Sequence, residues 1–420
     1  MPLTPYRGPF GYEQAAQLVR RTMFGAPPEQ VAALQRRGAP GAVDELLDYS
    51  RQELPDNPFV PEEAASPGAA ARVTIARWLY EMLHTPYPFR EQLTLFWHNH
   101  FAIEVRKVRH PQALAGYLGV LRDHGLGSFA KLTLAVATSP AMLRYLDNDR
   151  NVKGSPNENF ARELLELFTM GIGNYSERDV TEAARALTGW TIRHDPRDES
   201  KVIFAFNRRR HDPGIKTVLG SSGRLAGEDV IGLASRHLAT ASHIAAKLWR
   251  EFVGDQPDEQ GVETLADIFR QSGGDLRAVM RTLLGSEAFY KSRGGIIKSP
   301  IRYLVGALRS LSVPRLPERA YFALGEALER LGQLPLQPPN VAGWQGGRAW
   351  ISDATLLARI DTAKTILLEH NLLPLDGMTP ETLGLTMLGT SSNLFASYLT
   401  QLQPHQQAFL IMTSPEYALA

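Results

Sequence analysis

The stretch SPNENFARELLELFTMGIGNYSERDVTEAARALTGW, residues 155–190, decides the fold, because it predicts two helices that turn back on each other. Ser155 is expected to cap the first helix, and Glu158 completes a Ser-x-x-Glu capping box. Apolar residues then recur at helical spacing along one side of residues 160–168. Gly171 and Gly173 supply the left-handed backbone that commonly ends a helix. The pattern therefore predicts a helical hairpin in the middle of the chain.

The second half of this hairpin repeats the same logic. Ser176 is expected to cap the second helix, with Asp179 three residues further on. After Trp190 the period of apolar residues changes from helical to alternating, which is typical of strands. The predicted strands are Trp190–Arg193, Val202–Asn207 and Thr217–Leu219.

Helical patterns continue on both sides of these elements, and the last ones are Thr379–Met387, Leu394–Leu402 and Pro404–Thr413. We therefore predict a mainly α protein, a multi-helix globular body with a small antiparallel β insertion near residues 190–219. No linker marks a clear domain boundary. We expect one integrated unit made of an N-terminal helical region (1–189, containing the hairpin 155–189), the β insertion (190–225) and a C-terminal helical region (226–420).

One tetrapeptide occurs twice around the β insertion, as Arg193-His194-Asp195-Pro196 and Arg210-His211-Asp212-Pro213. If the strands pair as a hairpin centred near Val202, the two copies lie close together at one end.

Composition excludes several classes of function. The 420 residues include 45 basic and 44 acidic side chains and no cysteine. Balanced charge argues against nucleic acid or an anionic membrane as a partner, and no apolar run approaches the roughly 20 residues that span a bilayer. Without cysteine there are no disulfides, thiolate metal sites or cysteine nucleophiles. Residues 1–25 lack the pattern of a signal peptide, so we expect a soluble, cytoplasmic protein, with the periplasm as the alternative.

Several long motifs then occur in a fixed order: LFWHNHF (95–101), the segment 145–190, RRHDPGIKTVLG (209–220), GGDLRAVMRTLLGSEAF (273–289), KSP (298–300) and PPNVAGWQGGRAWI (338–351). Together they resemble the bacterial domain-of-unknown-function family numbered eighteen hundred, over residues from about Tyr12 to the C-terminus. This resemblance implies no activity, cofactor or catalytic residue. Many members of that family resemble exported proteins with leader segments, and this chain departs from that pattern.

The candidate metal ligands begin with His98 and His100, which flank Asn99 at the end of an apolar helix. Both can face one site only if the helix ends there, because residues two apart on a helix point in nearly opposite directions. Neutral imidazoles are common metal ligands. The alternative is one buried histidine bonded to a carbonyl and one exposed histidine.

Carboxylates of the central helix are the second candidate group. Glu163 lies on one stripe with Asn159 and Glu166 and has no cation one turn away, whereas Arg162 is spaced to form ion pairs along the helix. Unpaired burial would raise the pKa of Glu163, and a metal or an arginine would hold it ionised. The alternative is a solvated polar face.

His211 and Asp212 form the third group, in a turn before Pro213-Gly214. Such a pair can bind a metal or act as a base held by its carboxylate, and the alternative is an Asx turn. The tryptophans, among them Trp190, Trp344 and Trp350, are explained as core anchors, although aromatics around a polar pocket also suit a sugar or peptide ligand.

From these groups we predict a divalent-metal-dependent enzyme whose pocket is formed by the 155–190 hairpin, the His98/His100 helix end and the His211-Asp212 turn. Glu163, His211 and Asp212 are the predicted catalytic residues. His98, His100, Glu163 and His211 are the predicted ligands of Zn, Mn or Fe, and Asn159, Arg162, Glu166 and Trp190 are predicted to bind the substrate. Hydrolysis is ranked first because it needs only Lewis acidity and a bound water. The alternatives are a non-catalytic helical scaffold or binding protein and a metal-dependent oxidoreductase, and the ligand is an unknown small molecule, sugar or peptide.

Overall fold

The computed structural model of the chain describes residues 3–48, 56–61, 64, 66–370, 372–390 and 401–420, and segment 155–190 forms the predicted helical hairpin. Its first helix is α9 (Asn159–Glu163), which continues as the wider π-helix η3 (Leu164–Met170). The second helix is α10 (Glu177–Ala186), where Ser176 and Asp179 form the predicted capping box. Gly171 and Gly173 both have positive φ, as expected.

The predicted cap of the first helix is wrong. Ser155 forms an isolated bridge with Val152 and lies outside the helix. The side chain of Asn151 accepts the backbone N–H of Asn157 at 3.0 Å, which holds this segment as a loop. Glu158 instead accepts a hydrogen bond from the Thr181 hydroxyl at 2.7 Å, and it therefore connects α9 to α10.

Helices make up the N-terminal part of the chain, as predicted. They are α1 (Tyr12–Thr22), α2 (Pro28–Leu47), α3 (Pro67–His84), α4 (Pro88–His100), α5 (Val105–Val108), α6 (Pro111–His124), α7 (Phe129–Ala137) and α8 (Pro140–Tyr145), followed by the 3-10 turn η2 (Asn148–Arg150). Gly38, which has a φ of 69°, separates the two halves of α2.

The β insertion consists of two small antiparallel pairs. β1 (Trp190–Asp195) pairs with β2 (Asp198–Phe206), and β3 (Lys216–Val218) pairs with β4 (Ser221–Gly223). Trp190 faces Phe206, and the first hairpin turns at residues 196–197. The predicted proximity of the two Arg-His-Asp-Pro copies is wrong, because the first copy occupies the turn and the second follows the opposite end of β2.

The C-terminal part is again helical, with one irregular stretch at residues 332–346. Its elements are α11 (Gly227–Arg236), α12 (Leu238–Phe252), α13 (Glu259–Gln271), α14 (Leu276–Leu284), α15 (Glu287–Lys291), α16 (Pro300–Ser310), α17 (Glu318–Arg330), the 3-10 turn η5 (Gly347–Trp350), α18 (Asp353–Lys364), the π-helix η6 (Thr365–Glu369), α19 (Pro380–Leu388), α21 (Pro404–Thr413) and α22 (Pro415–Ala418). Of the predicted helix Leu394–Leu402, residues 394–400 lie outside the described residues. The mainly α fold with a small β insertion is confirmed.

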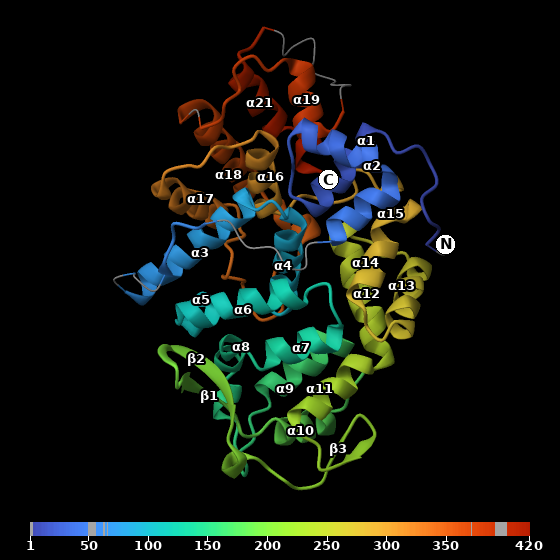
Figure 1. Cartoon of the computed structure of the whole chain (residues 1–420), viewed down its shortest axis with the longest axis vertical. Helices are drawn as coiled ribbons and strands as arrows, with labels where there is room; N and C mark the ends of the chain where they lie inside the picture. Colours follow the sequence, from blue (N-terminus) through green and yellow to red (C-terminus); the bar gives the residue numbers. More distant parts are fainter. Residues whose placement is uncertain (1–2, 49–55, 62–63, 65, 371, 391–400) are drawn as a thin grey trace.

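Figure 1 shows α4 in the middle of the molecule, with β1 and β2 toward one end and α19 and α21 at the other. The first helices lie beside the third quarter of the chain: Gln17 in α1 donates to the carbonyl of Phe289 at 2.7 Å, and Arg21 donates to the carbonyls of Phe252 and Val253. One hydrophobic core includes residues from all three predicted regions. Within the described part of the chain, no helix is long and apolar enough to cross a membrane.

A buried ion cluster fixes the direction of α4. Arg122 in α6 donates to Glu81 in α3 at 2.6 Å and to Glu91 in α4 at 2.7 Å, and the indole of Trp78 donates to Glu91 at 2.9 Å. All four side chains are buried. Arg77 also pairs with Glu81 at 3.3 Å, so that two arginines face the two carboxylates. Because each carboxylate has a cationic partner, the cluster orients α3, α4 and α6 without leaving an uncompensated ion. The cluster therefore fixes where α4 places His98, Asn99 and His100, which we call the HNH segment.

Candidate ligand-binding cavity

His98 at the end of α4 is a buried structural residue. Its Nε2 accepts the backbone N–H of Leu336 at 3.2 Å, so Nδ1 carries the proton and faces the Tyr117 hydroxyl at 3.5 Å. Burial lowers the pKa of His98 to about 3. With both nitrogens directed at protein atoms, the ring attaches the irregular 332–346 stretch to α4.

Asn99 holds the same stretch one step further along. Its Oδ1 accepts the backbone N–H of Trp344 at 2.7 Å, and its Nδ2 donates to the carbonyl of Trp344 at 3.3 Å. This approach requires glycine at position 343, where φ is +78° and a Cβ would lie 2.2 Å from Asn99 Oδ1. The LFWHNHF and PPNVAGWQGGRAWI motifs therefore meet where the Asn99 side chain binds the backbone of Trp344.

His100 connects α4 to the central hairpin and to α12. Its Nε2 donates to the carbonyl of Phe168 in η3 at 3.1 Å, and its Nδ1 lies 3.0 Å from Nζ of Lys247. Because Nε2 carries the proton, Nδ1 accepts from the lysine. Burial and the charge of Lys247 lower the pKa of His100 well below 6.5. The imidazole is therefore neutral.

Lys247 is half-buried and faces the end of η3. Its Nζ lies 3.4 Å from the carbonyl of Leu167, which His243 also contacts at 3.3 Å. Carbonyls in the last turn of a helix have no partner within the helix, and they attract basic groups. Burial, together with the charge of Arg250, lowers the pKa of Lys247 to about 8. No carboxylate in the described part of the chain forms an ion pair with Lys247.

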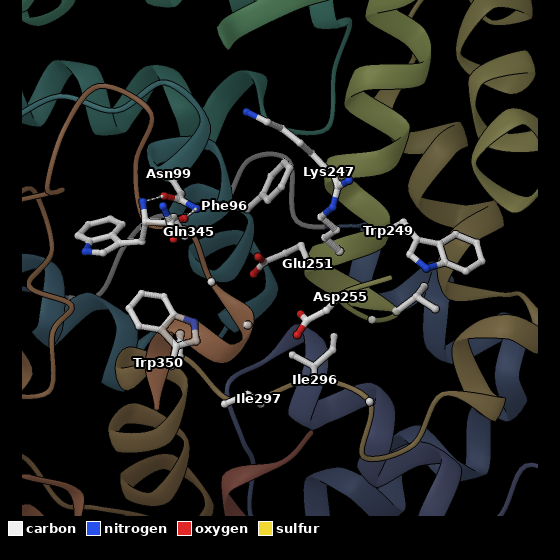
Figure 2. A pocket seen from close by; sticks show the side chains of 18 of the residues that line it. Phe96, Asn99, Lys247, Trp249, Glu251, Asp255, Ile296, Ile297, Gln345 and Trp350 are labelled. Carbon is white, nitrogen blue, oxygen red and sulfur yellow. Dashed lines mark hydrogen bonds between the residues drawn. The ribbon is translucent and has the colours of Figure 1, made fainter. Parts of the chain in front are cut away.

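A cavity of about 1190 Å³ opens beside these groups. Figure 2 shows Asn99, Gln345 and Trp350 on one side of it and Lys247, Glu251 and Asp255 on the other. Its walls come from the end of α4, the last turns of α12, residues 288–302 and the stretch 342–350. The lining includes charged, polar and aromatic side chains, among them Phe96, Asn99, His100, Lys247, Arg250, Glu251, Asp255, Lys291, Arg302, Trp344, Arg348 and Trp350.

Positive charge is in excess around the cavity. Five basic side chains (Lys247, Arg250, Lys291, Arg302 and Arg348) face two carboxylates (Glu251 and Asp255), which leaves an excess of three positive charges.

One of the two carboxylates is already occupied by protein groups. Glu251 pairs with Arg302 at 3.0 Å and accepts from Gln92 at 3.2 Å. Burial raises the pKa of Glu251, and Arg302 opposes that shift. Lys291 also pairs, with Glu287 at 2.6 Å. The remaining cations, Lys247, Arg250 and Arg348, form no ion pair with another described residue.

The predicted hairpin residues have local partners. Arg162 pairs with Glu177 at 2.7 Å and with Glu158 at 3.4 Å, and Glu166 accepts a short hydrogen bond from Tyr175. Asn159 donates to the carbonyl of Leu146 at 3.3 Å.

Glu163 is half-buried, and burial followed by the charge of Glu166 raises its pKa. This direction is the one expected for a carboxylate without a close cation, since Arg162 opposes it only weakly.

The predicted site residues His211 and Asp212 contact groups near the C-terminal end of α10. His211 is 2.9 Å from the carbonyl of Thr188, and Asp212 pairs with Arg185 at 2.8 Å. Asp212 also accepts the N–H of Gly214 at 2.8 Å, which is the Asx turn given as the alternative, and Arg185 lowers the pKa of that carboxyl. Trp190 is buried in the core.

His98, His100 and His211 thus contact different protein groups. In the part of the chain that the structure describes, no group of three or more His, Cys, Asp or Glu side chains is placed to hold a metal ion. Of the four predicted ligands, His100 lines the cavity. The catalytic and substrate-binding roles predicted for the hairpin and the His211-Asp212 turn stay predictions.

The sequence analysis missed Lys247, Arg250, Glu251 and Asp255. A pattern that would have found part of this set is His243, Lys247 and Glu251, spaced four apart on one face of a helix that otherwise reads as amphipathic. Their proximity to His100 depends on packing between α4 and α12, which are 147 residues apart at the Lys247–His100 contact.

Comparison with known proteins gives one finding. The model of a family described as "Protein of unknown function (DUF1800)" matches residues 17–419. No curated protein and no solved structure matches the chain.

Proposed function

Because the chain belongs to the DUF1800 family, whose function is unknown, we propose a function from the cavity itself: it binds a small molecule that joins an anionic group to a flat or ring-shaped part. The observation that carries this proposal is the half-buried ammonium of Lys247, which lines the cavity and has no carboxylate partner among the described residues.

The positive charge of Lys247 has no counter-ion among the described residues. A cation without a counter-ion is costly to bury, which is why the pKa of Lys247 lies near 8. An ammonium donates three hydrogen bonds, and among the described residues Lys247 contacts two acceptors, His100 Nδ1 and the Leu167 carbonyl. A carboxylate or phosphate beside Nζ would supply the third acceptor and the absent charge. Arg250 and Arg348 add bidentate donors for such a group.

Two tryptophans give the cavity a flat aromatic wall. Trp344 and Trp350 line the cavity although each is about nine-tenths buried, and the backbone of Trp344 is fixed by Asn99. A rigid aromatic face can stack on a flat group or on the apolar face of a sugar, and pairs of aromatic rings contribute about 0.5–1.5 kcal/mol beyond burial. Ligand pockets commonly measure about 300–1,000 Å³, so a cavity of about 1190 Å³ has room for such a molecule.

The metal-dependent hydrolase expected from the sequence is not carried into this proposal. It required Glu163, His211 and one histidine of the HNH segment to share a site, and the described residues do not place three such groups together. The binding-protein alternative agrees better with the cavity.

Isothermal titration with matched pairs tests the proposal. The pairs are ring-containing phosphates or carboxylates and their neutral parents, such as glucose 6-phosphate with glucose and galacturonate with galactose. We expect charged members to bind, and Lys247→Met and Arg250→Gln to weaken binding by about tenfold or more, which is about 1.4 kcal/mol each. Arg319→Gln is the matched control, because Arg319 is exposed and does not line the cavity. Equal binding of charged and neutral members, or no binding by any charged member at millimolar concentration, would contradict the proposal.

A further inference from the structure

A carboxylate and an aromatic ring flank one glycine turn in the cavity wall. The turn is Gly346-Gly347, and both glycines line the cavity. An added Cβ at Gly347 would lie 2.6 Å from Oδ2 of Asp255, and one at Gly346 would lie 4.0 Å from Nε1 of Trp350. Figure 2 shows the Asp255 carboxylate directed toward the side of the cavity that holds Trp350. Asp255 and Trp350 therefore belong to one part of the wall.

Asp255 has hydrogen-bonding capacity that the protein leaves unused. It is exposed and forms no ion pair or hydrogen bond with another described residue, whereas Glu251 is held by Arg302 and Gln92. A carboxylate only accepts hydrogen bonds, and its two oxygens offer about four acceptor positions. Its negative charge repels the anionic group that Lys247 binds. The part of the ligand that Asp255 suits is therefore a neutral hydrogen-bond donor.

Resting on the proposed function, we propose that the ring of the ligand is a sugar and that Asp255 accepts hydrogen bonds from two of its neighbouring hydroxyl groups. The anionic group of the ligand stays beside Nζ of Lys247, and Trp350 packs against the apolar face of the sugar ring. Two hydroxyls on adjacent ring carbons can each donate to one oxygen of the same carboxylate. Gln345 lines the cavity with an exposed amide that both donates and accepts, which suits a third hydroxyl.

A flat aromatic ring would use less of this wall. Such a ring can stack on Trp350, but it gives Asp255 no hydrogen-bond donor. Displacing water from a polar group without replacing its hydrogen bonds lowers affinity. The carboxylate beside Trp350 therefore favours a hydroxylated ring over a bare one.

Isothermal titration of the full chain with ring-exchanged pairs tests this inference. The pairs are glucose 6-phosphate with phenyl phosphate and galacturonate with benzoate, and each pair keeps the anionic group while the hydroxylated ring is replaced by a flat one. We expect the sugar members to bind at least about tenfold more tightly, because hydrogen bonds to a charged group are worth that much in affinity.

Asp255→Asn keeps the shape of the side chain and removes its charge. The variant should bind the sugar members about tenfold more weakly, and it should bind the flat members unchanged or more tightly, because a repelling charge is gone. Asp376→Asn is the matched control, since Asp376 is exposed and does not line the cavity.

The flat members separate this inference from the proposed function. Tighter binding of the sugar members, weakened by Asp255→Asn and unchanged by Asp376→Asn, supports both. Equal binding of flat and sugar members, or sugar binding that Asp255→Asn leaves unchanged, overturns the sugar assignment and leaves the anion site intact. No binding by any of the four compounds at millimolar concentration overturns both.

Discussion

Nζ of Lys247 lies 3.0 Å from Nδ1 of His100, so that α12 and α4 meet through an ammonium and a neutral imidazole. Burial and the charge of Lys247 keep the imidazole neutral, whereas burial and the charge of Arg250 lower the pKa of the lysine. The pair is stable in this form only because the lysine keeps its proton at neutral pH and the histidine does not. His100 lines the cavity beside Lys247, whereas His98, two residues earlier, is buried against Leu336 and Tyr117.

Lys247→Met is expected to change how stability depends on pH. The pKa of Lys247 is about 8 in the folded protein and about 10.4 in an unfolded chain. Between these values the unfolded chain binds more protons, so this lysine makes stability rise with pH. Urea unfolding from pH 7 to 10.5 should show the variant more stable than wild type at pH 7, with the difference shrinking as pH rises. The matched variant Lys131→Met should track wild type, and a Lys247→Met difference independent of pH would contradict the assignment.

Four histidines should make the protein acid-sensitive. Burial lowers the pKa of His84 and His243 to about 4 and that of His98 to about 3, and it lowers the pKa of His100 well below 6.5. Their stabilising contribution is complete above the unfolded pKa of about 6.5 and is lost as pH falls below it, at up to about 1.4 kcal/mol per pH unit for each histidine. Urea unfolding at pH 7, 6 and 5 measures the combined slope. A slope near zero between pH 6 and pH 5 would show that these rings are not kept neutral.

Gly343→Ala tests the contact between Asn99 and Trp344. Gly154 has a similar φ of +85° with no atom within 4 Å of an added Cβ, whereas a Cβ at Gly343 would lie 2.2 Å from Asn99 Oδ1. Gly154→Ala should therefore cost about 1–2 kcal/mol from the left-handed backbone alone. Gly343→Ala should cost about 1–3 kcal/mol more because of the steric overlap and should weaken binding in the cavity. Equal unfolding free energies for the two variants would show that Asn99 does not pack tightly against residue 343.

Arg122→Met should be strongly destabilising, because it leaves Glu81 and Glu91 buried without their shared cation. We expect a loss of about 3–5 kcal/mol in the free energy of unfolding. The control is Arg37→Met at the exposed pair with Glu45, where the change should stay below about 1 kcal/mol. Comparable losses in chemical denaturation would mean that the buried cluster does not position α4.

Much of the fold follows from local patterns. Helical periodicity, the Ser176–Asp179 cap and the glycines at 171 and 173 were read correctly because each depends on neighbours in sequence. The Ser155 cap failed because Asn151 makes a competing backbone contact. The hairpin of β1 and β2 was centred wrongly because its turn, at residues 196–197, lacks the asparagine-glycine pair that marks such turns most clearly.

The candidate site was only partly predictable. His100 was named because it belongs to a compact, aromatic-rich motif, and its neighbours in α12 were not, because a lysine on an amphipathic helix ordinarily faces solvent. What distinguishes Lys247 is burial against His100 and Leu167, a tertiary contact that no local pattern encodes.

The titration of Lys247 itself tests the central claim most directly. Lysines labelled at the ε-carbon with a stable isotope are followed by NMR across pH 6–11, with the Lys247 signal assigned from its absence in Lys247→Met. We predict a pKa of about 8 in the free protein and an upward shift when the tightest-binding phosphate or carboxylate is added, because a bound anion favours the ammonium. A pKa near the ordinary value of about 10.4 in the free protein, unchanged by that anion, would contradict the account.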